Sequence, residues 1–200
     1  MVSIIEPLEI ISNELLINAY RRKAISNNSD FDEFRGTAKF SLVWDESGCR
    51  SMLVIEDNGK VVRAQNDCGS LKCVRAKVMF ENKGIFEWDV MIKESKGVRF
   101  EVGVCASEYF KYEISVGGEP AGWVLNSDAE FWDSKTWERY CPKFVDNSKI
   151  TVHLDMYKRT LAFAVNGTKY PELSGCDNNL PSKLYPAVSL HHPCRIQFLN

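Results

Sequence analysis

The sequence lacks long apolar runs and an excess of charge of one sign. No apolar stretch approaches the roughly 18–20 residues that a transmembrane helix needs. Lys and Arg together number 25 and Asp and Glu 27, so the formal net charge is −2. A chain with so little net charge has no strong field to attract nucleic acid or an anionic membrane surface. We therefore expect neither of these partners.

The cysteines lack the spacing of a zinc or redox site. There are seven, an odd number, and no Cys-x-x-Cys pair occurs among them. Their scatter along the chain indicates reduced thiols rather than a disulfide framework. The N-terminus, MVSIIEPLEII, has no basic segment and carries Glu6 and Pro7 inside its apolar patch, so it is a poor signal peptide. Together these features predict an intracellular, cytoplasmic protein.

Catalytic motifs are also missing. The chain contains no G-x-S-x-G elbow, no P-loop and no G-x-G-x-x-G. One family of sandwich hydrolases uses Glu-x-Asp-x-x-Glu on a strand. Here Glu87 and Asp89 fill the first two positions, but Ile92 fills the third. We interpret the two carboxylates as a solvated strand face or structural hydrogen-bond acceptors, and we expect no enzyme.

Histidine is scarce, which argues against a metal site. The three histidines are His153, His191 and His192, and zinc requires three or four convergent ligands. His153 lies in the middle of a predicted strand. Cys194 is close to the histidine pair in sequence, but adjacent residues at a strand end point in opposite directions. We expect no metal and no cofactor. A pH-sensitive contact is the more plausible use of the histidine pair.

A length of 200 residues suggests one domain with a short appendage. Residues 7–25 predict a helix, since Pro7 suits a first turn and Leu8, Ile11 and Leu15 form an apolar stripe. We therefore expect a helical extension at 1–30 and the main domain at 31–200. The helix could pack on that domain, pair two chains or belong to a neighbouring domain.

From about residue 34 the apolar period changes from helical to two. Phe86, Trp88, Val90 and Ile92 share one face of a predicted strand. Asn58-Gly59 and Asn166-Gly167 separate apolar runs and favour tight hairpin turns. Short strands between turn signals predict an all-β, antiparallel β-sandwich.

Five segments in order resemble the SPRY domain family: KGIFEWDVMI, GVRFEVGVCAS, GWVL, KITVHLDMYKRTLAFAVNGTKY and LYPAVSL. The resemblance covers roughly residues 34–200. It implies a bent antiparallel β-sandwich that acts as a protein-interaction module and recognises a short segment of a partner through loops on one rim.

Three stretches resemble the peptide-contacting loops of the SPRY-and-SOCS-box branch. The partner-binding residues that this resemblance implies are Arg63, Ala64, Gln65, Asn66, Tyr112, Ser115, His191, His192 and Pro193. Related domains carry Val-Trp-Gly where this chain has His-His-Pro. Two imidazoles in place of an apolar floor predict a ligand other than the acidic, Asn-rich peptide of that branch.

The sequence thus predicts a non-catalytic module that binds a peptide segment or surface of a protein partner, as a substrate-recognition or adaptor domain. It is expected to be a monomer or a dimer formed through the helix. The alternative is a glycan-binding, lectin-like sandwich, in which Trp132, Trp137 or Tyr140 would stack on sugars.

Overall fold

The structure is a computed structural model. It describes residues 41–49, 51–81, 84–106, 115–118, 121–133, 137–173 and 180–199. All of them belong to one unit of the chain, Lys39–Asn200. The predicted helix at 7–25 and the predicted boundary after residue 30 lie outside the described residues, so both stay predictions.

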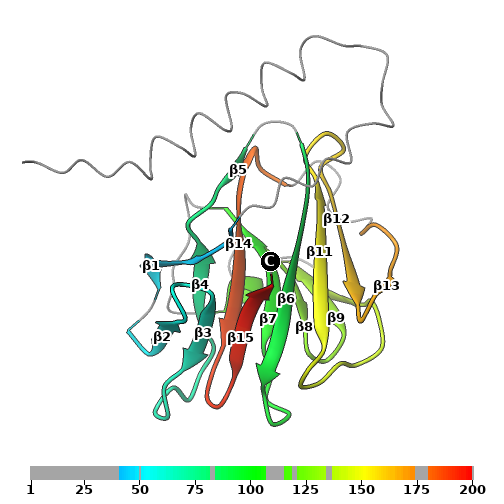
Figure 1. The fold of residues 1–200 in the computed structure, drawn as a ribbon. Coiled ribbons are helices and arrows are strands. Elements are labelled where there is room, and N and C mark those ends of the chain that lie inside the picture. Colours follow the sequence, from blue (N-terminus) through cyan, green and yellow to red (C-terminus); the bar gives the residue numbers. More distant parts are fainter. Residues whose placement is uncertain are drawn as a thin grey trace, which may run out of the picture. The chain divides into compact units, whose positions relative to one another are not determined.

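The described residues form two antiparallel sheets packed face to face (Figure 1). The eight-stranded sheet runs in the order β1 (Trp44–Cys49), β4 (Lys72–Ala76), β14 (Lys183–Leu190), β7 (Glu101–Cys105), β8 (Gly122–Asn126), β9 (Glu130–Asp133) and β10 (Trp137–Arg139), with β5 (Phe80–Glu81) paired to β14. The seven-stranded sheet runs β13 (Thr168–Lys169), β12 (Thr160–Val165), β11 (Lys149–Asp155), β6 (Ile85–Glu94), β15 (Arg195–Leu199), β3 (Val61–Ala64) and β2 (Leu53–Glu56). The antiparallel β-sandwich predicted from the sequence is confirmed.

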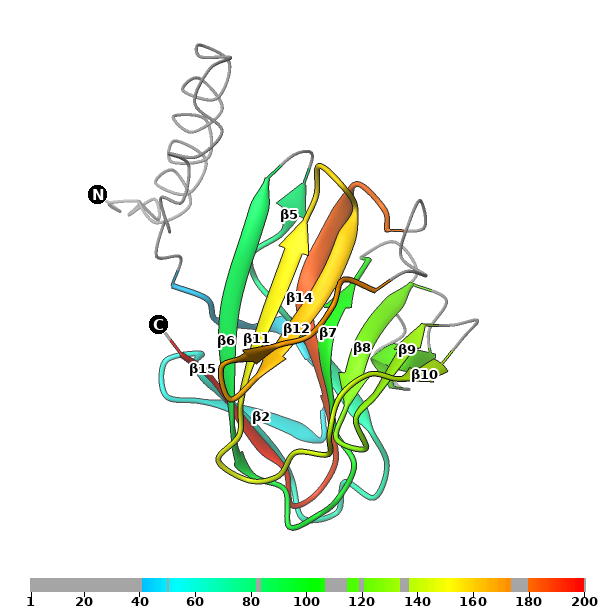
Figure 2. The same ribbon diagram turned by 90° about the vertical axis from the view of Figure 1, so that its right-hand side faces the viewer.

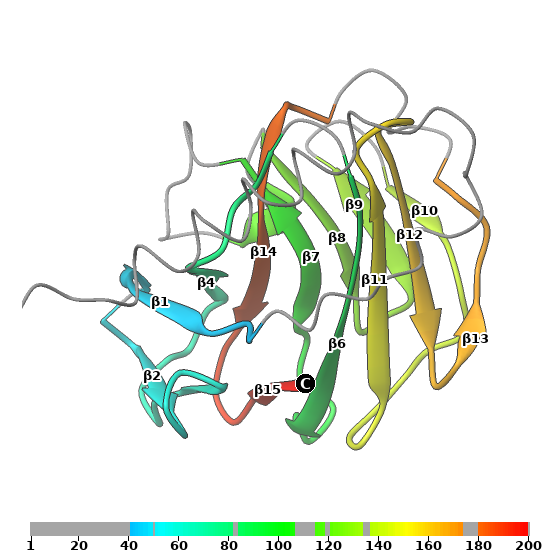
Figure 3. The same ribbon diagram turned by 45° about the horizontal axis from the view of Figure 1, so that its top comes forward.

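The core lies between the two sheets, as Figures 2 and 3 show for β6, β11 and β12 in one layer and β14, β7 and β8 in the other. On β6, Trp88, Val90 and Ile92 are buried. This confirms the period-two pattern predicted for that strand. Next to Val90, which pairs with Phe198 across β6 and β15, the rings of Trp44 and Phe198 stack with centroids 3.9 Å apart.

Both predicted Asn-Gly turns are present. Asn58 and Gly59 have φ angles of 51° and 87° between β2 and β3, and Asn166 and Gly167 have 51° and 84° between β12 and β13. Positive φ at both central residues is what a type I′ turn requires, and it matches the twist of the strands that the turn joins. These turns set the register of both hairpins.

Tyr140 connects the two sheets at one edge of the sandwich. It follows β10, the last strand of the eight-stranded sheet. Its hydroxyl donates to the carbonyl of Pro171 (2.7 Å) and accepts from the amide of Phe163 on β12 (3.0 Å). The segment around β9 and β10 therefore covers the sandwich edge.

Five cysteines of the described chain are buried: Cys68, Cys73, Cys105, Cys141 and Cys194. Burial raises the pKa of Cys105 to about 12 and that of Cys141 to about 11. Thiols with such pKa values stay protonated and unreactive near neutral pH. In the part of the chain described here, no helix is long and apolar enough to cross a membrane.

Candidate functional site

Two of the three predicted loops lie against each other at one end of the sandwich. The first, residues 65–71, follows β3, and the second, residues 191–194, joins β14 to β15; we call them the rim loops. The amide of His192 donates to the carbonyl of Cys68 (3.0 Å), and the amide of Ala64 donates to the carbonyl of Cys194 (3.1 Å). Figure 1 shows both loops at the lower end of the sandwich. The first bond joins the two loops, and the second joins the second loop to the end of β3.

Arg63 takes part in a small ion-pair network just before the first rim loop. It lies opposite Arg195 on β15. Its Nε is 2.7 Å from one carboxylate oxygen of Glu56, and Arg195 Nη2 is 3.0 Å from the other. Because these side chains are partly exposed, the network adds little to stability. Because one carboxylate faces two guanidinium groups, the network compensates only part of their positive charge.

The next three residues differ in exposure. Ala64 is buried, with 3% of its surface exposed, and packs in the core. Gln65 is half-buried, and its amide group donates to the carbonyl of Ser51 (3.0 Å). Asn66 is exposed. A partner approaching this loop would therefore meet Asn66 and the outer part of Gln65, while Ala64 anchors the loop.

The second rim loop presents two imidazoles. His192 is exposed, and His191 and Pro193 are half-buried. Burial lowers the pKa of His191. The charge of His192 lowers this pKa further, whereas a hydrogen bond to the backbone of His192 raises it. The neutral imidazole that results offers one hydrogen-bond donor and one acceptor.

Ser115 lies on a turn that is attached to the same end of β14. The amide of Gly118 donates to its carbonyl and hydroxyl oxygens, at 3.1 and 3.2 Å. The adjacent amide, that of Val116, donates to Ser189 Oγ (2.7 Å), two residues before His191. Tyr112, the other predicted residue of this stretch, lies outside the described residues.

Residues that sequence reasoning missed hold this turn, η2 (Val116–Gly118), on the sheet. Glu101 is fully buried on β7; its Oε2 accepts from the amide of Gly117 (3.1 Å) and its Oε1 is 3.4 Å from Arg99 Nη2. Val116 packs on an apolar patch of the outer face of the eight-stranded sheet. A glutamate within an apolar strand was the signal that could have indicated a buried structural contact.

The carboxylates considered for catalysis are in structural contacts. Glu87 Oε2 is 2.7 Å from His153 Nδ1, and Asp89 Oδ2 is 2.9 Å from Lys149 Nζ. Asp89 also accepts a hydrogen bond from Thr151. No three His, Cys, Asp or Glu side chains within the described ranges are placed to hold a metal ion.

The aromatic residues of the lectin alternative do not form one platform. Trp132 and Trp137 stack with centroids 6.4 Å apart, and Trp137 is 63% exposed. Tyr140 instead directs its hydroxyl to the backbone at the sandwich edge, as described above.

Comparison with known proteins gives one family and one fold. The model of the SPRY domain matches residues 85–200. The SPRY domain of human HERC1 has a TM-score of 0.65 and 19% identity, over 78% of this chain and 97% of that one. The TRIM65 PSpry domain has a TM-score of 0.66 and 15% identity, over 80% and 92%. Stonustoxin has a TM-score of 0.62 and 16% identity, over 79% of this chain and 27% of its own. A search of curated proteins found no match.

Proposed function

The chain belongs to the SPRY domain family, and from that premise we propose that it is a non-catalytic module that binds a short peptide segment or surface of a partner protein through the rim loops. SPRY domains are typically interaction modules that bind other proteins. The observation that carries the proposal is the joining of two predicted contact loops through their main chains. A substrate-recognition or adaptor role would use this surface.

Preorganisation is the physical reason why this rim suits recognition. The bonds from His192 to Cys68 and from Ala64 to Cys194 fix the loops before a partner arrives. A rigid loop loses little conformational entropy on binding, so more of the contact energy appears as affinity. The side chains that remain available, Asn66 and His192, are exposed.

The chemistry of the rim indicates a polar partner segment. Asn66, Gln65 and the two imidazoles offer hydrogen-bond donors and acceptors. Arg63 and Arg195 share the single carboxylate of Glu56, so one positive charge remains beside them. We include Tyr112 and Ser115 in the proposed surface on the family resemblance, and Ser115 also because its turn is attached to Ser189.

The test is affinity capture from a lysate of the source cells, read by mass spectrometry. Wild type is compared with the double variant His191→Ala/His192→Ala and with Tyr112→Ala, and thermal melts check folding. Tyr157→Ala is the matched control, because Tyr157 is 59% exposed in the turn between β11 and β12. We expect the rim variants to lose partners that wild type and the control retain. Equal capture by all four proteins would show that the rim is not the binding surface.

We infer that the module is cytoplasmic, and its low net charge supports binding to neither nucleic acid nor membrane. We propose that it acts as a monomer or as a dimer formed through residues 7–25. Light scattering of the full chain separates these two states, and fluorescence microscopy of a tagged chain tests the location.

A further inference from the structure

β10 (Trp137–Arg139) is an exposed edge strand. It is the last strand of the eight-stranded sheet, and each of its three residues is exposed. Figure 2 shows it at the side of the sandwich, beyond β9. Three strands, β7, β8 and β9, lie between it and β14, which leads into the second rim loop. This edge is therefore separate from the proposed rim surface.

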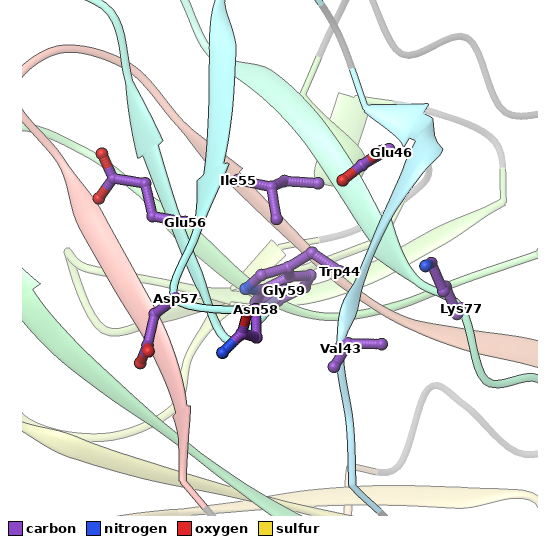
Figure 4. A pocket seen from close by; sticks show the side chains of 9 residues that line it. All are labelled: Val43, Trp44, Glu46, Ile55, Glu56, Asp57, Asn58, Gly59 and Lys77. Carbon is purple, nitrogen blue, oxygen red and sulfur yellow. The ribbon is translucent and has the colours of Figure 1, made fainter.

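The other sheet edges offer less to an added strand. On the opposite side of the sandwich, the amide of Trp44 on β1 donates to the carbonyl of Gly59 in the β2–β3 turn (2.8 Å). Figure 4 shows Trp44 beside Asn58 and Gly59. A Cβ on Gly59 would lie 2.8 Å from the Cβ of Val43, so the turn is pressed against β1. β13, the last strand of the seven-stranded sheet, is two residues long.

The backbone of β10 presents hydrogen-bonding groups outward at two positions. β10 pairs with β9 in one antiparallel register, and in that register the amide of Tyr140 donates to the carbonyl of Ala129 (2.9 Å). Antiparallel bonds fall on alternate residues, so Tyr140 and Glu138 bond to β9. The amides and carbonyls of Trp137 and Arg139 then point to the free edge. These are the groups with which an added strand forms hydrogen bonds.

The side chain of Trp137 is an exposed aromatic ring on a fixed support. It is 63% exposed and stacks on Trp132, its cross-strand neighbour, with centroids 6.4 Å apart. The guanidinium of Arg99 lies 4.8 Å from the Trp132 ring, and Trp132 Nε1 donates to Glu130 Oε2 (3.0 Å). Tryptophan is enriched among the residues that contribute most to binding at protein interfaces. A partner side chain would thus pack on a ring that is already supported.

Arg139 has no carboxylate partner in the described part of the chain. It lies opposite Glu130, but Glu130 accepts a hydrogen bond from Trp132 instead. Asp128, in the turn between β8 and β9, is 2.7 Å from Lys143 Nζ. Arg139 forms no ion pair with a described residue, so its guanidinium can take a carboxylate from another molecule.

Glu138 places a negative charge on the other face of β10. Adjacent residues of a strand point to opposite faces, so Glu138 points away from Trp137 and Arg139. It lies opposite Phe131 of the core and forms no ion pair with a described residue. β10 thus offers an aromatic ring and a positive charge on one face and a negative charge on the other.

We propose that β10 binds an extended segment of a protein partner as an added antiparallel strand, and that this segment carries an acidic, a basic and an aromatic residue in that order. The acidic residue lies opposite Arg139, the basic residue opposite Glu138 and the aromatic residue opposite Trp137. Opposite charges and aromatic pairs across two strands stabilise their pairing.

A second copy of this chain is a poorer occupant of the edge. If Trp137 of each copy lay opposite Arg139 of the other, the two Glu138 carboxylates would face each other. Like charges directly opposite each other destabilise a strand pair. The charges of β10 therefore favour a different chain with the complementary order.

The experiment follows the ¹⁵N-labelled full chain by NMR as it is titrated with the peptide acetyl-Thr-Thr-Glu-Lys-Trp-Thr-Thr-amide. The threonines favour an extended chain. Each of the five tryptophans of the protein gives one indole signal, and Trp137→Phe identifies that of Trp137. A second probe carries lysine in place of the glutamate. Two further probes are N-methylated, one at the glutamate amide, which faces β10 in the proposed pairing, and one at the lysine amide, which points away from it.

We expect the first probe to move the indole signal of Trp137 and to shift the backbone amide signals of Trp137 and Arg139 downfield. Methylation at the glutamate should weaken binding about fivefold or more, because it removes a hydrogen bond. Methylation at the lysine should leave the affinity unchanged.

Variants test the charge pair. Arg139→Gln should weaken binding of the first probe about two- to fivefold, the range for one cross-strand pair of opposite charges. Arg159→Gln, at an exposed arginine in the β11–β12 turn, is the matched control and should not change the affinity. The lysine-for-glutamate probe should bind wild type more weakly than the first probe does, and Arg139→Glu should reverse that preference.

Four results would overturn the proposal. They are an absence of any shift at Trp137, equal binding of the two N-methylated probes, equal binding of wild type to the glutamate and lysine probes, and a dimer in light scattering that Trp137→Ala abolishes. The last result would make a second copy the occupant. His191→Ala/His192→Ala should leave probe binding unchanged, so this inference and the proposed rim function can fail separately.

Discussion

Replacing Ser189 with alanine should destabilise the domain by about 2 kcal/mol. The amide of Val116 donates to Ser189 Oγ at 2.7 Å, and both residues are fully buried. Without the hydroxyl, the amide stays buried with no acceptor, which costs about 1–3 kcal/mol. Alanine is nearly the same size as serine, so the cavity left behind adds little. The loss therefore measures one hydrogen bond that holds the Ser115 turn to β14.

Ser127→Ala provides a matched control. Ser127 Oγ also accepts a backbone hydrogen bond, from the amide of Phe100, but at 3.4 Å and at a half-buried position. Water can replace that acceptor, so we expect a loss below about 0.5 kcal/mol. For a domain of this size, 2 kcal/mol corresponds to a fall in Tm of about 4–8 °C.

Urea unfolding of the two variants and wild type gives the free energies of unfolding. Hydrogen exchange of the Val116 amide adds a local measurement, and it should accelerate in Ser189→Ala. The reasoning is refuted if Ser189→Ala unfolds within about 0.5 kcal/mol of wild type, or if the two variants lose equal stability.

Three further predictions use the same unfolding measurements. Gly59→Ala should lower the free energy of unfolding by about 1–2 kcal/mol more than Gly167→Ala does. Both glycines have positive φ, but only at Gly59 would the new Cβ meet a neighbour, the Cβ of Val43 at 2.8 Å. Tyr140→Phe should cost about 1–3 kcal/mol because the hydroxyl makes two hydrogen bonds to the backbone; a loss below that range would show that water replaces them. Burial lowers the pKa of His153, so the unfolded chain binds the proton more readily and stability should fall as pH drops through about 6.5. His153→Gln should reduce that fall, and an identical pH profile would contradict the assignment.

Hairpins and core faces could be predicted from the sequence because they depend on neighbours along the chain. Asn58-Gly59 needs only positive φ at two adjacent residues, and the structure has it. The burial of Trp88, Val90 and Ile92 also follows from the local pattern. Every second residue of a strand points to the same face, and one face of β6 packs on the core. The helix at 7–25 lies outside the described residues and stays a prediction.

Strands buried on both faces could not be predicted by alternation. All five residues of β7 are buried, including Glu101. The reason is that the turn at Val116 covers the outer face of the sheet and directs the Gly117 amide to Glu101. That contact joins positions 16 residues apart through a loop whose path no local pattern specifies.

The candidate site was predictable as a set of loops, but the role of each side chain was not. The sequence placed Arg63 and Ala64 in the contact surface, and the structure shows an arginine paired with Glu56 and an alanine packed in the core. Both facts depend on which strands become neighbours. The pairing of β15 with β3, which brings Arg195 beside Arg63, is a long-range event.

The rim loops are held by main-chain hydrogen bonds, so their geometry does not depend on which side chains stand at the rim. The bonds that hold them, from His192 to Cys68 and from Ala64 at the end of β3 to Cys194, join main-chain atoms only. A substitution of Asn66 or His192 therefore removes no hydrogen bond between the loops and leaves their geometry intact. Side chains at the rim can change while the fold stays constant, as expected for domains that share this sandwich at 15–19% identity. The main chain of these residues thus holds the loops, and their side chains set the chemistry of the exposed rim.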